Sequence, residues 1–231
     1  MSLRSHAAVT AACVVTLVAG SAAAQRSGWM QSFAVNVHDL VTDGENSYFI
    51  LKPGYQLTLE GAGRNPDRLV ITVLRETATI GGVETRVVEE RETSKGRLAE
   101  VSRNFYAIDR RTHDVYYFGE DSATYKNGVV VNREGSWRHG VQAQFGLMMP
   151  GSPMPGLRFY QELAPTIAMD RAEILSVNAT VTTPAGTFDR CVTVRETTPL
   201  ERFARETKVY APGIGVIRDG SLSLVSHAYV P

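Results

Sequence analysis

Hydrophobic and polar positions alternate along most of the chain with the two-residue period of a β-strand, whereas helical periodicity is weak throughout. The pattern predicts short strands at residues 55–59, 69–74, 83–89, 101–108, 115–118, 129–132, 174–183, 187–194, 207–210 and 221–229. Gly81 with Gly82, and Asn127 with Gly128, have the composition of tight hairpin turns, because glycine tolerates a positive φ. Many short strands at a spacing of roughly ten residues predict an all-β fold, either an antiparallel sandwich or a strongly curved sheet that forms a partly open barrel.

Two stretches of the chain resemble each other at an offset of 104 residues. Residues 82–107 and 186–211 align without a gap and are identical at eight of 26 positions, which include an Arg-Glu-Thr triplet and a Tyr-Ala pair. Composition alone gives about one or two identities. We therefore expect one β domain at 48–231, built from two related units of about 100 residues at 48–121 and 154–231, with residues 122–153 as an added segment.

The first 24 residues differ in character from the rest. Arg4 precedes an uncharged, mostly apolar run at 7–19 that is too short to cross a bilayer, and three alanines at 22–24 follow it. We therefore expect a signal peptide at 1–24 and an N-terminal arm at 25–47. No later stretch is apolar enough for a transmembrane segment, so the mature protein is expected in the periplasm or outside the cell.

Charge and cysteine content exclude several classes of partner and site. The chain has 24 basic and 24 acidic residues, a neutral balance that gives no electrostatic reason to expect a nucleic-acid partner. After the signal peptide only Cys191 remains, which excludes an internal disulfide, and its alignment with Val87 in the repeat predicts a buried, inert thiol. The chain contains neither a nucleotide-binding glycine motif nor a serine-nucleophile elbow, so we expect no cofactor and assign no catalytic residue.

Several short phrases resemble a family of uncharacterised secreted bacterial proteins that has no known function. They are Val-Tyr-Tyr-Phe-Gly-Glu-Asp at 115–121, Tyr-Lys-Asn-Gly at 125–128, Glu-Gly-Ser-Trp at 134–137, Met-Pro at 149–150, Gln-Glu at 161–162, Ala-Met-Asp at 168–170, Pro-Ala-Gly-Thr-Phe at 184–188 and Tyr-Ala-Pro-Gly-Ile-Gly at 210–215. The resemblance extends from Tyr48 to about Val216. It implies a protein of the bacterial envelope or the extracellular space, and it carries no reaction and no site residues.

The added segment is where the two units differ, and added loops on a repeated frame carry function. Its aromatic, histidine and methionine side chains, with one tyrosine from the preceding strand, are the candidate ligand or partner contacts: Tyr117, Trp137, His139, Phe145, Met148 and Met149. We expect a non-enzymatic protein that binds an apolar small molecule or lipid through its concave sheet. One alternative is a docking or accessory subunit of an envelope protein assembly, and another is a segment that only closes the core.

Four acidic residues allow a different chemistry. Glu120, Asp121, Glu162 and Asp170 are candidate ligands of a hard cation, and two such carboxylates in one cleft can also act as an acid and a base. Neighbouring residues of a strand point to opposite faces, so Glu120 and Asp121 share a site only if the strand has ended. A carboxylate-based hydrolase or a cation-binding protein requires Glu120, Glu162 and Asp170 to converge in one cleft with shifted pKa values.

Overall fold

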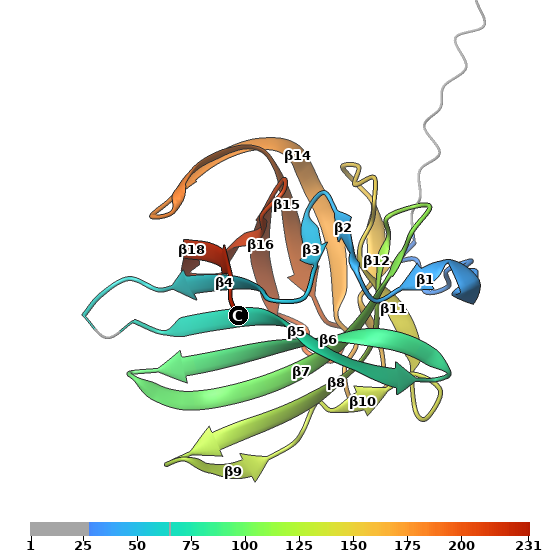
Figure 1. Ribbon diagram of the computed structural model, residues 1–231, viewed down its shortest axis with the longest axis horizontal. Helices are drawn as coiled ribbons and strands as arrows, with labels where there is room; N and C mark the ends of the chain where they lie inside the picture. The colour runs from blue at the N-terminus through green and yellow to red at the C-terminus, as the bar shows by residue number, and fades with distance from the viewer. Residues whose placement is uncertain (1–27, 65) are drawn as a thin grey trace, which may run out of the picture.

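The computed structural model describes residues 28–64 and 66–231, which form an almost purely β structure (Figure 1). The prediction of an all-β fold is confirmed. Within these ranges the only helical element is the 3₁₀ turn η1 (Val37–Asp39), and no helix is both long and apolar enough to cross a membrane. The expected signal peptide at 1–24 lies outside the described residues.

The ten predicted strands are all present, most of them longer than the pattern indicated, and eight further strands accompany them. In chain order the strands are β1 (Leu40–Val41), β2 (Gly44–Asn46), β3 (Phe49–Leu51), β4 (Tyr55–Glu60), β5 (Arg68–Ile80), β6 (Val83–Ser94), β7 (Arg97–Asp109), β8 (Val115–Lys126), β9 (Val129–Asn132), β10 (Trp137–Arg138), β11 (Gln144–Met149), β12 (Arg158–Tyr160), β13 (Glu162–Leu163), β14 (Arg171–Thr183), β15 (Gly186–Thr197), β16 (Arg205–Ala211), β17 (Gly215–Asp219) and β18 (Leu222–Tyr229). Both predicted tight turns occur, between β5 and β6 and between β8 and β9, and all four turn residues have positive φ.

One large antiparallel sheet curves into a nearly closed barrel. Its order is β12-β14-β15-β16-β17-β18-β4-β5-β6-β7-β8-β11-β13. The two ends of this order meet in one stretch of chain, because β12 ends at Tyr160 and β13 begins at Glu162. Gln161 lies at the break between them, and the backbone N–H groups of Gln161 and Glu162 both donate to the Asp170 carbonyl (2.8 and 3.1 Å). This stretch, which we call the seam, brings the two ends of the sheet together.

Gly146 of β11 lies against the seam. A Cβ atom at this position would overlap the carbonyl group of Gln161, so the residue has to be glycine for the backbones to approach this closely. The seam therefore depends on a glycine inside a strand, which is the usual mark of close backbone approach.

The two ends of the barrel differ. The antiparallel order places the β4–β5, β6–β7, β8–β9, β15–β16 and β17–β18 connections at one end, and we call this end the mouth. A separate hairpin of β2 and β3 covers the interior near the other end. The fully buried Asn46 attaches the hairpin to the barrel, because its side-chain amide donates to the carbonyls of His113 and Pro150 (2.8 and 3.0 Å). The barrel is thus a cup that is covered at one end.

The stretches that resemble each other in sequence form β6 with β7 and β15 with β16, of which β6 and β15 are equally long and β7, with 13 residues, is longer than β16, with 7. The strands that precede them correspond as well. Strands β5 and β14 have 13 residues each, and their partners β6 and β15 have 12 each. In both cases a third strand, β7 or β16, continues the meander. An internal duplication stays a prediction, and this correspondence is compatible with it.

Candidate functional site

The barrel interior contains adjoining cavities that share lining residues, and together they form the cup. At the covered end lies a small apolar space of about 50 Å³, which we call the floor. Its wall includes Phe49 of the covering hairpin and Leu57, Ile71 and Val73 of β4 and β5. Glu90 and Lys208 also reach the floor, and both line the next cavity toward the mouth. The polarity of the cup therefore changes along its axis.

The middle of the cup is a polar space of about 140 Å³. Here the Tyr117 hydroxyl donates to the side-chain oxygen of Asn104 (2.5 Å) and lies 3.3 Å from Glu120 Oε2. On the opposite wall the side-chain amide of the buried Gln161 donates to Glu196 Oε1 (2.9 Å). These bonds join β7 to β8 and the seam to β15, so the polar wall of the middle cavity is held in one arrangement.

The mouth contains three wider cavities of about 330, 310 and 370 Å³. Among the described residues, twelve acidic side chains line the cup and its mouth, against the three basic side chains Arg68, Arg205 and Lys208. The acids are Asp67, Glu90, Glu92, Glu100, Glu120, Glu134, Glu162, Asp170, Glu196, Glu201, Glu206 and Asp219. They are half of the 24 acidic residues of the chain, so a neutral protein concentrates its acids around the cup. Six of the twelve are exposed, mainly at the mouth, and the other six are buried or half-buried.

Lys208 already has carboxylate partners. Its ammonium group lies 3.1 Å from Glu196 Oε2 and 3.4 Å from Asp219 Oδ2. Burial lowers the pKa of Lys208, but the charges of Glu196 and Asp219 outweigh this effect and leave its pKa well above the ordinary value. The lysine therefore stays protonated and contacts two of the twelve acids with a single positive charge, which leaves the cup with an excess of carboxyl groups.

Glu90 of β6 lies where the floor, the middle and one part of the mouth meet. Burial raises its pKa to about 8, although the charge of Lys208 acts in the opposite direction. No described residue forms a hydrogen bond or an ion pair with its carboxyl group. Glu90 is therefore mostly protonated at pH 7 in the empty cup, and it is an acid that the fold itself does not use.

Three of the four acids that the sequence suggested converge. Glu120, Glu162 and Asp170 all line the middle cavity and one cavity of the mouth. Loss of solvent around the carboxyl group raises the pKa of each, and the charges of neighbouring acids raise it further. Asp170 is exposed in the mouth, where solvent reduces this effect, whereas Glu162 is buried and accepts a hydrogen bond from Trp137 Nε1 (3.3 Å).

The fourth acid is not part of this group. Asp121 pairs with Arg138 at 2.5 Å and lines none of the cavities of the cup. It is adjacent to Glu120 within β8, so its side chain points to the opposite face of the sheet, as the sequence argument requires for a continuing strand. Within residues 28–64 and 66–231, no three His, Cys, Asp or Glu side chains are placed to hold one metal ion.

The six candidate contacts from the sequence separate into two groups. Tyr117 and Met148 line the cup. Trp137 is 1% exposed, with its indole N–H bonded to Glu162, and Met149 is buried as deeply. His139 packs against Phe145 (5.1 Å between ring centres), and its Nδ1 accepts the N–H of that residue (3.2 Å).

These contacts give most of the added segment a packing role. Burial lowers the pKa of His139, so its ring is neutral at pH 7 and joins an apolar cluster. Among the candidates from this segment, Trp137, His139, Phe145 and Met149 thus pack in the structure and do not line the cup. Cys191 is completely buried as a free thiol, and burial raises its pKa, in line with the predicted inert cysteine.

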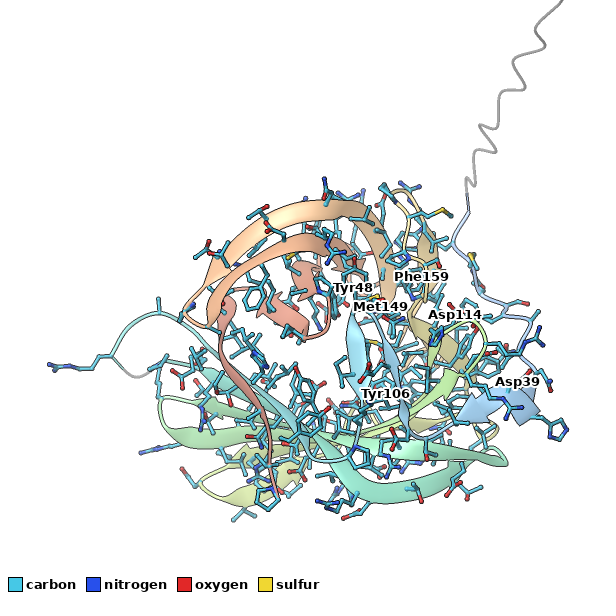
Figure 2. All side chains as sticks on the ribbon, turned by 45° about the horizontal axis from the view of Figure 1, so that its top comes forward. Asp39, Tyr48, Tyr106, Asp114, Met149 and Phe159 are labelled. Atoms are coloured by element: carbon cyan, nitrogen blue, oxygen red, sulfur yellow. The ribbon has the colours of Figure 1, made fainter. Side chains whose placement is uncertain are left out.

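The sequence analysis missed residues that recur in both related units. Glu92 and Glu196 are equivalent at the offset of 104 residues, and both line the cup or its mouth. Tyr106 and Tyr210 are equivalent in the same way and line the middle and the floor. Figure 2 shows Tyr106 beneath the covering hairpin, and its ring lies 5.1 Å from that of Phe49 in β3. The positions shared by the two units therefore form part of the cavity wall.

Apolar side chains lie exposed beside the acidic mouth. Leu200 is 48% exposed and Phe203 80% exposed, both in the connection between β15 and β16. Leu200 and the exposed Ile167 line one cavity of the mouth. Such residues fit the expectation of a docking surface, which stays a prediction because the structure contains no partner.

Comparison with known proteins adds no further information. No protein-family model, no curated protein and no solved structure matches this chain. The function therefore has to be inferred from the cup itself.

Proposed function

We propose that this protein is a periplasmic or secreted binding protein that takes a small organic cation into the cup. The observation that supports the proposal is the segregation of charge, with twelve acids and three bases around one cavity system. Carboxyl groups that are enclosed without cationic partners destabilise a fold. Glu90, Glu120 and Glu162 are half-buried or buried and form no ion pair with a described residue, so their accumulation in one place calls for a ligand that offsets the cost. A positively charged ligand supplies the missing partners.

The dimensions of the cup favour a polar cation over a lipid. The apolar floor has only about 50 Å³, whereas pockets that enclose drug-sized ligands have roughly 300 to 1,000 Å³. The three mouth cavities reach that range and are acid-lined. An apolar small molecule, the ligand expected from the sequence, would have most of its surface against carboxyl groups. A short alkyl end fits the floor, and one or more amino groups fit the middle and the mouth.

The spacing of the acids also favours an organic cation over a metal ion. The carboxyl groups are distributed from Glu90 at the floor to Glu100, Glu134 and Glu201 in the mouth. Calcium needs six to eight oxygen ligands converging at about 2.3–2.6 Å, and no such group occurs among the described side chains. Alkylamines and linear polyamines carry their charges at the ends of, or at intervals along, a flexible methylene chain, which matches a distributed set of acids.

Isothermal titration calorimetry with a matched ligand series tests this proposal. The series is hexylamine, spermidine, hexanol and hexanoate, titrated into the mature protein at pH 7.5 and low salt. We expect the two amines to bind, the affinity to fall with increasing salt, and hexanol and hexanoate to bind at least ten times more weakly. Equal binding of hexanol and hexylamine, or binding of hexanoate alone, would refute the cation proposal.

A second candidate function is carboxylate-based hydrolysis, which one specific observation favours. Glu120, Glu162 and Asp170 line one cavity, and the pKa of each is raised. A protonated acid beside an ionised carboxylate is the pair that glycoside hydrolysis requires. Hydrolysis of p-nitrophenyl glycosides or esters that is abolished in E162Q and kept in the exposed control E84Q would support this function. If neither class of substrate is hydrolysed faster than in buffer alone, the hydrolase function is refuted.

A further inference from the structure

Within the proposed cation site, the deepest contact can be assigned to individual residues. We propose that Glu90, with the hydroxyl groups of Tyr106 and Tyr210, is the innermost binding position of the cup, and that it accepts a primary alkylammonium group in exchange for the proton of its carboxyl group. This inference rests on the proposed function, since it names the ligand class and the residue that selects it. It goes beyond that function in coupling binding to the release of a proton.

The position of Glu90 supports this assignment. It is the acid that lines the floor, the middle and part of the mouth, so a ligand entering from the mouth meets it last, where the wall becomes apolar. The other acid of the floor, Asp219, is already paired with Lys208. A chain whose ammonium group reaches Glu90 can place its methylene groups against Leu57, Ile71 and Val73.

Two tyrosines offer open hydroxyl groups at this position. Tyr106 and Tyr210 are each only 3% exposed, and they line the cup in cavities that Glu90 also lines. Within residues 28–64 and 66–231 neither hydroxyl group has a hydrogen-bond partner, and neither oxygen is one of the completely enclosed unbonded atoms, so both are free to bond to a molecule in the cup. Glu90 shares the middle cavity with Tyr106 and the floor with Tyr210. Burial raises the pKa of both tyrosines, and the charge of Glu90 acts in the same direction. An ammonium group has three donors, which suit one carboxylate and two hydroxyl oxygens.

Charged and titratable groups from several strands surround Glu90. The groups that act electrostatically with Glu90 are Glu92 of β6, Tyr106 of β7, Tyr117 and Glu120 of β8, Lys208 and Tyr210 of β16, and Asp219 of β17. The cavities that Glu90 lines also contain Asp67, Arg68, Glu162, Asp170, Glu196 and Glu206. The two cations are already paired, Lys208 with Glu196 and Asp219, and Arg68 with Glu60. The surroundings are otherwise acidic or neutral, so they favour a further cation at Glu90.

Binding at this position exchanges one positive charge for another. In the empty cup the Glu90 carboxyl group carries a proton at pH 7, because burial raises its pKa to about 8. The ammonium group binds to the carboxylate form, and the displaced proton passes to the solvent. At pH 7 one bound ammonium group therefore releases about 0.9 proton, and from pH 9 to pH 6 the affinity falls by roughly two orders of magnitude.

The test is calorimetric titration of hexylamine into the wild-type protein, E90Q and E84Q at pH 6, 7.5 and 9, in phosphate and in Tris. The two buffers differ in ionisation enthalpy, so the difference between the measured heats gives the number of protons released. Glu84 lies on the same strand and is exposed, so E84Q is the matched control. The wild-type protein and E84Q should release a proton and bind more tightly as the pH rises. E90Q should release none, lose the pH dependence and bind at least ten times more weakly at pH 9.

Each outcome separates this inference from the function on which it rests. Equal affinity and equal proton release in the wild-type protein and E90Q would overturn the role of Glu90 and leave cation binding standing. Failure of hexylamine to bind, with spermidine binding, would overturn the alkylammonium position alone. Failure of both amines would overturn both proposals.

Discussion

Replacing Glu90 by glutamine should make the protein more stable at high pH and change little at low pH. In the folded protein burial raises the pKa of Glu90 from 4.5 to about 8. Between these two values the folded state holds a proton that the unfolded state has lost, so the stability of the wild-type protein falls as the pH rises. Glutamine is isosteric with the protonated acid and cannot ionise, so E90Q escapes this loss.

The magnitude follows from the shift. A change of 3.5 pKa units, at about 1.4 kcal/mol per unit, corresponds to about 5 kcal/mol in the fully ionised limit. Solvent that enters through the mouth stabilises the charge, so the expected gain of E90Q at pH 9 is about 2 to 5 kcal/mol. At pH 5 the folded wild-type protein still holds its proton, so the two free energies of unfolding should agree within about 1 kcal/mol.

Urea unfolding of the wild-type protein, E90Q and E84Q at pH 5, 7 and 9 measures these differences directly. The E84Q control should follow the wild-type protein at every pH, because Glu84 is exposed. If the free energies of unfolding of E90Q and the wild-type protein differ by the same amount at pH 5 and pH 9, the raised pKa of the Glu90 carboxyl group is refuted. A lower stability of E90Q at pH 9 would show that Glu90 has a cationic partner in the empty cup.

Three further predictions concern the frame of the cup. Gly146→Ala should cost at least 2 kcal/mol in urea unfolding or prevent folding, because its Cβ would overlap the seam backbone, whereas Gly28→Ala, which has open space, should unfold like the wild-type protein. Trp137→Phe should lose about 1 to 3 kcal/mol in the same measurement, because Glu162 loses its indole N–H donor. Cys191 should react with a thiol reagent only after unfolding, and fast labelling of the native protein would contradict its complete burial.

The strands could be predicted from the sequence because alternation and turn residues are local signals. The seam could not, because it depends on residues far apart in the chain. Strand β11 runs through a segment rich in Met, Pro and Gly, and its pairing becomes clear only when Gly146 meets Gln161. The short strands β1 to β3 likewise depend on distant partners, as the bonds from Asn46 to His113 and Pro150 show.

The candidate site was predicted only in part. The sequence analysis required Glu120, Glu162 and Asp170 to converge in one cleft if they act together, and all three line the middle cavity. The concentration of acids around the cup was missed because a neutral net charge says nothing about how charges are distributed in space. A usable signal was present in the alternation itself, since Glu90 and Glu92 lie two residues apart and therefore share a face of β6.

The most direct test of a cationic ligand is native mass spectrometry of the protein, isolated near neutral pH from its own host. We expect the mass of the chain plus a small amine, and loss of that amine when the sample is acidified to pH 5. A bare chain, a bound anionic or neutral lipid, or a second polypeptide in place of an amine would contradict the account.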